Sequence, residues 1–161
     1  MIDPGTIAAV YIALFVGHQL ADHWIQTQPQ ADHKGCDPDH GGGRHEHCST
    51  WRSRWYCAKH VATYGATQLV VLALVALVTE LTISPAGFAA GMAVNLVTHF
   101  IADRRAPLRW LADRTGSGRF WQLGTPRADR DDNPSLGTGA YALDQSWHYA
   151  WLLVAAILIT I

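Results

Sequence analysis

The chain has 161 residues, of which 49% are hydrophobic and only 16% charged, and its formal net charge is -1. A chain of this length corresponds to one domain, and nothing in it resembles a linker to a second fold. The net charge gives no indication of a partner, because acidic residues such as Asp129 and Asp131 offset neighbouring arginines.

Three segments are almost free of charge: residues 6–27, 61–101 and 141–161. A transmembrane helix needs about 20 mainly apolar residues, so the middle segment has room for two helices. They are separated at Ser84-Pro85, because proline suits the start of a helix and ends the preceding one. The sequence therefore predicts an all-α integral membrane bundle of four antiparallel transmembrane helices, at about 6–27, 59–81, 85–103 and 141–161. Two long loops, 28–58 and 104–140, connect them.

The two ends of the chain are expected on the outer side of the membrane. The opening MIDPGT has neither the basic segment nor the cleavage site of a signal peptide, so the first helix is expected to be retained. All 12 Lys and Arg residues lie in the two long loops or at the helix edges beside them. By the positive-inside rule these loops are cytoplasmic.

Histidine and aspartate recur four residues apart near the predicted cytoplasmic ends. HxxxD occurs at residues 18 and 22 and again at 99 and 103, and the last helix carries the reverse order at 144 and 148. Residues four apart share one face of a helix, so each pair can point into the bundle. Antiparallel packing would bring them together with the histidine that opens the second helix. The layer then comprises His18, Asp22, His60, His99, Asp103, Asp144 and His148.

This layer predicts a metal site. Ionisable side chains in a bilayer are costly and mark functional sites. Imidazole and carboxylate ligands suit a divalent cation such as zinc, manganese or iron, zinc being the first choice, and the layer has enough ligands for one or two ions. All but His60 are the principal ligands, and His60 is a further ligand or a catalytic base. The alternative is a hydrogen-bonded layer that fixes helix packing, with Asp144 as a helix cap.

The first loop contains a second set of candidate ligands, in HKGCDPDHGGGRHEHC and just after it. These are Cys36, His40, His45, His47, Cys48 and Cys57. Such a Gly-rich Cys/His segment is typical of a zinc-stabilised loop, although the spacing matches no standard zinc finger. In a cytoplasmic loop the thiols are expected to be reduced. The alternative is a disordered loop that binds metal only adventitiously.

The second loop mixes arginines with Trp110, Phe120 and Trp121. Basic and aromatic residues beside a membrane indicate contact with anionic lipid headgroups. Nucleic-acid binding is not expected, because no nucleic-acid-binding motif accompanies the charges. The rest of this loop is interpreted as an ordinary connection. In the third predicted helix, AGFAAGMA at residues 86–93 supplies small residues for close helix packing.

Three motifs, HQLADHWIQT, HFIAD and LDQSWH, carry a family resemblance. They resemble the pattern of a family of small uncharacterised bacterial membrane proteins, domain of unknown function 3307. The likeness covers the membrane segments and leaves out the Cys/His loop, and it implies a multi-pass protein of the bacterial inner membrane with no assigned activity. The histidine and aspartate layer is also similar, by site chemistry alone, to membrane-bound metal-dependent hydrolases.

The preferred hypothesis is a metal-dependent hydrolase of a lipid or lipid-linked substrate, in which Arg104 and Arg105 hold an anionic head. The alternative is a non-enzymatic metal-binding, sensing or accessory membrane protein. Transport through the membrane is disfavoured, because outer halves such as AAVYIALFV and LLVAAILITI are nearly all apolar. A homo-oligomer or a larger membrane complex is compatible with the sequence.

Overall fold

The computed structural model describes residues 3–36, 49–125 and 138–161, and within these ranges the chain is helical with no strand. The prediction of an all-α protein is confirmed there. In chain order the helices are α1 (Pro4–Leu20), the π-helix η1 (Ala21–Ile25), α2 (Gln28–His33), α3 (Thr50–Thr79), α4 (Pro85–Asp103), α5 (Ala106–Arg114), α6 (Gly118–Trp121) and α7 (Gly139–Thr160).

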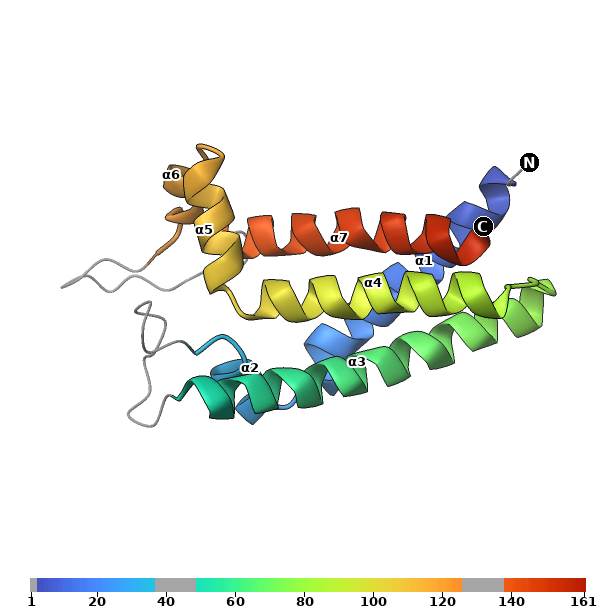
Figure 1. The fold of residues 1–161 in the computed structure, drawn as a ribbon, viewed down its shortest axis with the longest axis horizontal. Helices are drawn as coiled ribbons and strands as arrows, with labels where there is room; N and C mark the ends of the chain where they lie inside the picture. The colour runs from blue at the N-terminus through green and yellow to red at the C-terminus, as the bar shows by residue number, and fades with distance from the viewer. Residues whose placement is uncertain (1–2, 37–48, 126–137) are drawn as a thin grey trace.

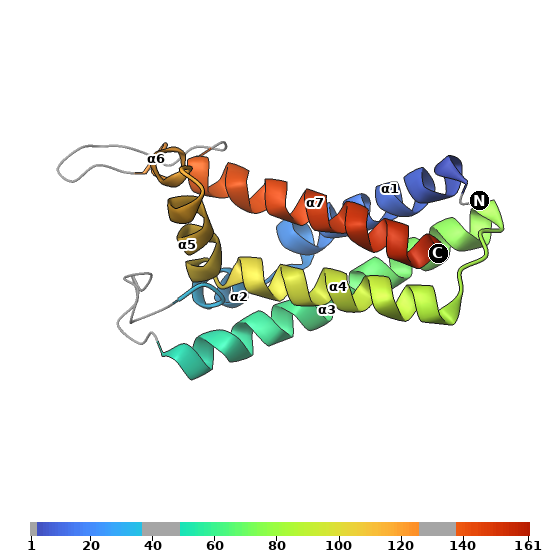
Figure 2. The same ribbon diagram turned by 45° about the horizontal axis from the view of Figure 1, so that its top comes forward.

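Helices α1, α3, α4 and α7 pack lengthwise into an elongated bundle. Helix α4 makes its most extensive contacts with α7, and α1 packs against both α3 and α7. The described N-terminal end of α1 and the C-terminal end of α7 lie at the same end of the bundle, whereas α2, α5 and α6 gather at the opposite end (Figures 1 and 2). We call that opposite end the loop-side end.

Three helical segments are long and apolar enough to cross a membrane: Pro4–Ile25, Thr50–Thr79 and Pro85–Asp103. Helix α7 is not among them, and its first half carries the polar side chains of Asp144, Gln145 and His148. The outward face of α3 is apolar, with Leu74 57%, Leu77 78% and Val78 81% exposed. A contiguous exposed apolar face of this kind is expected where lipid, rather than water, surrounds a helix.

The helices begin where short polar side chains cap them. The Asp3 carboxylate accepts a hydrogen bond from the backbone N–H of Thr6 at 2.8 Å, and this bond lowers the pKa of the carboxyl from its usual value. The Ser84 hydroxyl caps α4 in the same way through Gly87 N–H, at 3.0 Å. Pro4 and Pro85 occupy the first helical positions of their helices, where a missing N–H has no cost.

The segments predicted as long loops contain helical structure that the hydropathy pattern does not reveal. Helix α3 begins at Thr50, well before the predicted start at residue 59, because Ser49 caps it by accepting from Arg52 N–H at 3.2 Å. Helix α2 lies within 28–58, where the Gln30 side chain accepts from Thr27 N–H at 2.8 Å. Helices α5 and α6 lie within 104–140. These pieces are polar and short, so mean hydropathy does not detect them.

Small residues allow α4 to approach α7 closely. A Cβ atom added at Gly91 would lie 2.6 Å from the carbonyl oxygen of Ala155, and one added at Gly87 would lie 2.8 Å from that of Leu158. The close packing expected for residues 86–93 is therefore confirmed, and glycines four apart on one face provide it. Beside this contact lies the apolar core, which includes Val10, Leu14, Leu72, Met92, Leu152 and Ile159.

Candidate metal centre

The seven side chains of the predicted layer come together near the loop-side end of the bundle. They form three overlapping groups, in each of which one ligand atom per residue lies within 4.8 Å of the others. The groups are His18, Asp22 and His99; His60, His99 and Asp103; and Asp103, Asp144 and His148. Asp22 and Asp144 are partly buried and the other five are buried. Four long helices and η1 thus supply one polar cluster.

Four atoms of this cluster, which we call the four-ligand set, converge most closely. The Nε2 atoms of His60 and His99 lie 3.1 Å apart. His60 Nε2 is 3.3 Å from both Asp22 Oδ1 and Asp103 Oδ2. His99 Nε2 is 3.6 Å from the same Asp22 oxygen and 3.2 Å from the same Asp103 oxygen.

The five separations that involve the two imidazole nitrogens are close to those between ligand atoms of one metal ion. Zinc binds imidazole nitrogen and carboxylate oxygen at about 2.0–2.2 Å, so two ligand atoms of a tetrahedral site lie about 3.3–3.5 Å apart. The measured distances of 3.1–3.6 Å are scattered around that value. His60, His99 and Asp103 can therefore hold a divalent cation, and Asp22 Oδ1 lies close enough to both nitrogens to contribute.

The hydrogen bond on the other side of the His60 ring favours a cation between these atoms. With the Gln26 amide in the orientation that satisfies its neighbours, its oxygen accepts from His60 Nδ1 at 3.3 Å and from Lys34 Nζ at 2.7 Å. With Nδ1 bonded to Gln26, His60 Nε2 faces one oxygen each of Asp22 and Asp103. A cation between these atoms would remove the repulsion between their lone pairs.

The atoms of the cluster are also poorly satisfied by hydrogen bonds within the described ranges. Asp22 Oδ1 and Asp103 Oδ2 are buried without a hydrogen-bond partner there. Lys34 pairs with the other oxygen of Asp103, at 2.7 Å, and no other Lys or Arg in the described chain forms an ion pair with either carboxylate. Two buried carboxylates with one ammonium leave an excess of negative charge, which a divalent cation would neutralise.

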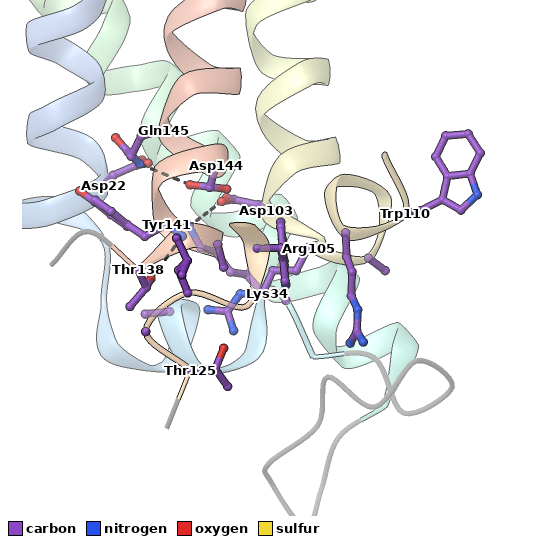
Figure 3. A pocket seen from close by; sticks show the side chains of 18 of the residues that line it. Asp22, Lys34, Asp103, Arg105, Trp110, Thr125, Thr138, Tyr141, Asp144 and Gln145 are labelled. Atoms are coloured by element: carbon purple, nitrogen blue, oxygen red, sulfur yellow. Dashed lines mark hydrogen bonds and ion pairs between the residues drawn. The ribbon is translucent and has the colours of Figure 1, made fainter. Parts of the chain in front are cut away.

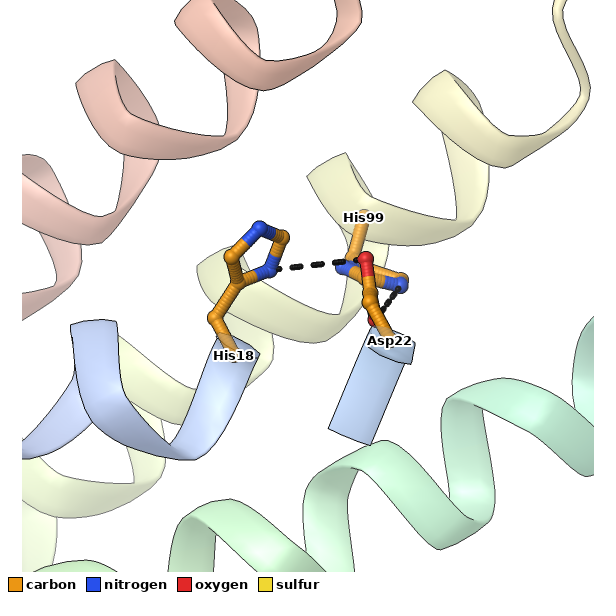
Figure 4. Close-up of side chains that lie close together, drawn as sticks. All are labelled: His18, Asp22 and His99. Atoms are coloured by element: carbon orange, nitrogen blue, oxygen red, sulfur yellow. Dashed lines mark ion pairs between the residues drawn. The ribbon is translucent and has the colours of Figure 1, made fainter. Parts of the chain in front are cut away.

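The π-helix η1 positions Asp22. Its wider turn is closed by the bond from Gln26 N–H to the carbonyl of Ala21, at 2.9 Å. The Asp22 carboxylate lies between two imidazoles, with Oδ2 3.6 Å from His18 Nδ1 and Oδ1 3.6 Å from His99 Nε2 (Figure 4). Single π-turns in helices occur frequently at functional sites. The sequence shows no signal for this change of helix type.

The Asp144 and His148 pair lies beside the four-ligand set. His148 Nδ1 bonds to the backbone carbonyl of Asp144 at 2.8 Å, so Nδ1 is the donor in this contact. His148 Nε2 is buried without a hydrogen-bond partner in the described chain. The Asp144 side chain is 27% exposed, so this pair connects the buried cluster with the space outside it.

A polar network supports His99 from the interior of the bundle. The Tyr64 ring stacks on the His99 imidazole with centroids 3.8 Å apart, and its hydroxyl donates to Asn95 Oδ1 at 2.9 Å. Gln68 Nε2 donates to that hydroxyl at 2.8 Å and to the Leu14 carbonyl at 2.9 Å. The apolar core lies on the far side of this network, so the polar cluster is confined to one end of the bundle.

A cavity of about 1030 Å³ adjoins the cluster at the loop-side end. Its lining includes the carboxylates of Asp22, Asp103 and Asp144, together with Lys34 and Arg105. Figure 3 shows Asp103 and Asp144 near Lys34 and Arg105, with Thr125 further out. The carboxylates of the candidate metal centre are therefore open to a molecule held in this cavity.

The two arginines that were expected to hold an anionic headgroup have different surroundings in the structure. Arg104 does not line the cavity; its guanidinium donates to the carbonyl of Lys34 at 2.8 Å and to the Ser53 hydroxyl. It thereby ties α4 to the segment after α2. Arg105 does line the cavity. Lys34 and Gln26 are site residues that sequence reasoning missed, because the fold of η1 and α2 brings them to the cluster and no spacing pattern marks them.

Two of the six ligands predicted in and just after the first loop, Cys36 and Cys57, lie within the described residues. Cys36 is disulfide-bonded, which differs from the expectation of reduced thiols and removes its sulfur as a thiolate ligand. Cys57 is a free, buried thiol on α3 that donates to the carbonyl of Phe100 at 3.7 Å, and it belongs to none of the three ligand groups. The other four predicted ligands, His40, His45, His47 and Cys48, lie outside the described residues.

Comparison of the chain with protein-family models, with curated proteins and with solved structures finds no match.

Proposed function

We propose that the protein is a membrane-embedded, metal-dependent hydrolase of a lipid or lipid-linked substrate. The observation that carries this proposal is that His60 Nε2 and His99 Nε2 lie 3.1 Å apart and that each lies 3.2–3.6 Å from both Asp22 Oδ1 and Asp103 Oδ2. Zinc is the ion that we infer, because it prefers imidazole nitrogen and carboxylate oxygen ligands. In this arrangement His60 is a metal ligand, so a residue other than His60 acts as the general base.

Asp144 and His148 are the groups that we assign to proton transfer. A catalytic zinc keeps a coordination position open, so a divalent ion held by His60, His99 and Asp103, with Asp22 nearby, would lower the pKa of a coordinated water and polarise the oxygen of the bond to be cleaved. Asp144 borders both the cluster and the cavity, so its carboxylate can accept the proton of the attacking water. In the hydrolysis, the water oxygen forms a bond to the electrophilic centre and the ester bond breaks. The leaving oxygen then receives the proton that Asp144 accepted from the water.

A fourth transmembrane segment, α7, and an antiparallel arrangement complete the proposal. Support comes from the cluster itself, since residues near the C-terminal ends of α1 and α4 meet residues near the N-terminal parts of α3 and α7. Exposed tryptophans mark the same end, with Trp24 83% and Trp51 78% exposed. Tryptophan is enriched at membrane interfaces. The cluster would then lie just inside the cytoplasmic leaflet of the inner membrane, and the resemblance to the small bacterial membrane family stays a prediction.

The cavity favours a substrate-binding role over a purely structural one. A layer that serves only helix packing needs satisfied hydrogen bonds and no open space. Here buried ligand atoms lack partners in the described chain, and a cavity reaches three of the carboxylates. A non-enzymatic accessory or sensing role remains the second hypothesis, and metal content together with hydrolysis separates the two.

The test begins with metal content per chain in detergent-purified protein. We expect about one equivalent of zinc in the wild type and loss of the ion in His60→Ala and His99→Ala. His23→Ala is the matched control, because His23 lies beside Asp22 on η1 but bonds only Gln19 and Tyr141 in the described chain. Absence of metal from both the wild type and the ligand variants would refute the site. Metal without hydrolysis of any lipid ester would favour the accessory hypothesis.

The cytoplasmic placement of the loop-side end needs its own test. The distribution of Lys and Arg supports it, whereas the disulfide at Cys36 argues against it, since cytoplasmic thiols are kept reduced. Labelling a Gln28→Cys variant with a membrane-impermeant maleimide, in intact cells and in inverted vesicles, distinguishes the two, because Gln28 is exposed at the loop-side end. We expect the new thiol to react only in inverted vesicles. Reaction in intact cells would reverse the orientation.

A further inference from the structure

The cavity beside the cluster holds cationic side chains that the metal-dependent hydrolysis does not explain. Lys34, Arg105 and Arg109 all line it, on the side of α2 and α5. The side chains of Arg105 and Arg109 make no hydrogen bond or ion pair with any residue in ranges 3–36, 49–125 and 138–161. Two guanidinium groups that have no partner among these residues can bind a ligand in the cavity, and the planar guanidinium fork fits phosphate oxygens in pairs.

The backbone holds Arg105 in an unusual conformation. Its φ of 58° and ψ of -46° lie outside the regions that non-glycine residues favour. The N–H of Ala106 bonds to the carbonyl of Arg104 at 2.6 Å, so Arg105 is the central residue of a γ-turn with positive φ, the rarer and more strained form. Strained residues of this kind cluster at ligand-binding sites, where the surrounding structure maintains them. The turn directly follows Asp103 of the four-ligand set.

The segment after α2 provides room for the Arg105 side chain. A Cβ atom added to Gly35 would lie 2.6 Å from Arg105 Cδ and 2.7 Å from its Nε. A residue with a Cβ atom at position 35 would therefore collide with the Arg105 side chain where it now lies against the backbone of Gly35. The backbone turn and the absence of a side chain at Gly35 together allow Arg105 to line the cavity.

The net charge of the residues that line the cavity makes the affinity for an anion depend on whether the metal is bound. Three basic side chains and four acidic ones, Asp22, Asp103, Asp113 and Asp144, line the cavity, so its formal charge is one negative. A divalent cation on Asp22 and Asp103 reverses the sign to one positive. An anion is then favoured only when the metal is bound, and each ligand increases the affinity of the other by the same factor.

We infer that the substrate carries a phosphoryl group, which binds between the metal centre and the guanidinium groups of Arg105 and Arg109. This inference rests on the proposed metal-dependent function and names its substrate class. Phosphate oxygens suit both a divalent cation and paired guanidinium donors. Apolar and aromatic residues of the same lining, Trp110, Trp121 and Leu123, would contact the group esterified to the phosphate. A lipid phosphate and free phosphate share this headgroup chemistry.

The experiment measures binding of dodecyl phosphate and of inorganic phosphate to the full chain in a neutral detergent, by titration calorimetry, with zinc bound and after chelation. We expect dodecyl phosphate to bind the zinc form and to lose at least about tenfold in affinity in the chelated form and in Arg105→Gln. Arg105→Lys is expected to recover part of the loss, because it restores a charge without the guanidinium fork. Arg119→Gln is the matched control, since Arg119 is exposed on α6 and lies outside the cavity lining.

The outcomes separate this inference from the proposed function. Tighter binding of dodecyl phosphate than of inorganic phosphate assigns the site to a phosphorylated amphiphile, and equal binding assigns it to the free anion. Bound zinc with no phosphate affinity, or with affinity unchanged in Arg105→Gln, would overturn the phosphoryl inference and leave the metal centre intact. A wild-type chain without zinc would overturn the metal centre. Dodecyl phosphate affinity that is unchanged after chelation would show a phosphate site independent of the metal, and would overturn the inferred link between the two.

Discussion

His60 Nε2 and His99 Nε2 lie 3.1 Å apart, although 39 positions separate the two residues in the sequence and they belong to different helices. Each nitrogen also lies within 3.6 Å of the same two carboxylate oxygens. One proton shared between the two rings would satisfy only one of these contacts. A divalent cation satisfies all of them at once, and this relationship is the basis of the predictions that follow.

Removing the Gln26 amide is expected to weaken metal binding about 10–100-fold, the usual effect of losing the partner that orients a ligand imidazole. The Gln26 oxygen accepts from His60 Nδ1 and Lys34 Nζ, so Gln26→Leu frees the His60 ring to rotate. Competition with a fluorescent zinc chelator measures the affinity. Gln28→Leu is the control, because Gln28 bonds only Asp32 on the exposed side of α2. Equal affinities of the two variants would contradict the proposed orientation of His60.

One tightly bound ion per chain is expected, and His148→Ala is expected to retain it. His148 belongs to a ligand group with Asp103 and Asp144 but lies outside the four-ligand set. Elemental analysis at increasing zinc concentration gives the stoichiometry. A second equivalent that disappears in His148→Ala would instead assign Asp103, Asp144 and His148 to a second ion that shares the Asp103 carboxylate.

Tyr64→Phe is expected to lower the free energy of unfolding by about 1–3 kcal/mol while the chain still binds zinc. The variant keeps the ring that stacks on His99 but removes the hydroxyl that bonds Asn95 and Gln68. The buried Asn95 Oδ1 loses its donor, whereas Gln68 Nε2 keeps its bond to the Leu14 carbonyl. Thermal unfolding of the metal-free protein in detergent measures the change. Thr63→Val on the same helix is the control, since the Thr63 hydroxyl bonds only backbone carbonyls at an exposed position. Unchanged stability of Tyr64→Phe would show that the network has no role in stability.

Gly91→Leu is expected to separate α4 from α7 and to cost about 1–3 kcal/mol or more through overpacking. The cause is the carbonyl of Ala155, 2.6 Å from the position of an added Cβ, because a backbone atom cannot move aside as a side chain can. Ala89→Leu is the control, as Ala89 is exposed on the same helix. The melting temperature in detergent measures the loss of stability. The zinc affinity is a second measurement, because His99 and Asp103 lie on α4 beside Asp144 on α7, and separating the two helices would displace these residues. A Gly91→Leu protein as stable as Ala89→Leu would exclude close packing at this contact.

The sequence by itself determined the helical class, the three long apolar helices and the residues of the polar cluster. Their hydrophobic length and their four-residue spacing are local properties, and helix geometry alone converts that spacing into a shared face. The spacing of His99 and Asp103 therefore indicated their common direction without knowledge of the fold.

Only the tertiary structure decided which atoms converge and what surrounds them. The π-turn at Asp22, the return of Lys34 and Gln26 toward the cluster, and the γ-turn at Arg105 depend on contacts between segments distant in sequence. No local pattern encodes them, because the free energy that maintains such conformations comes from the packing of neighbouring helices rather than from the residues themselves. The same holds for Arg104 and Arg105, adjacent in sequence, of which one ties helices together and the other lines the cavity.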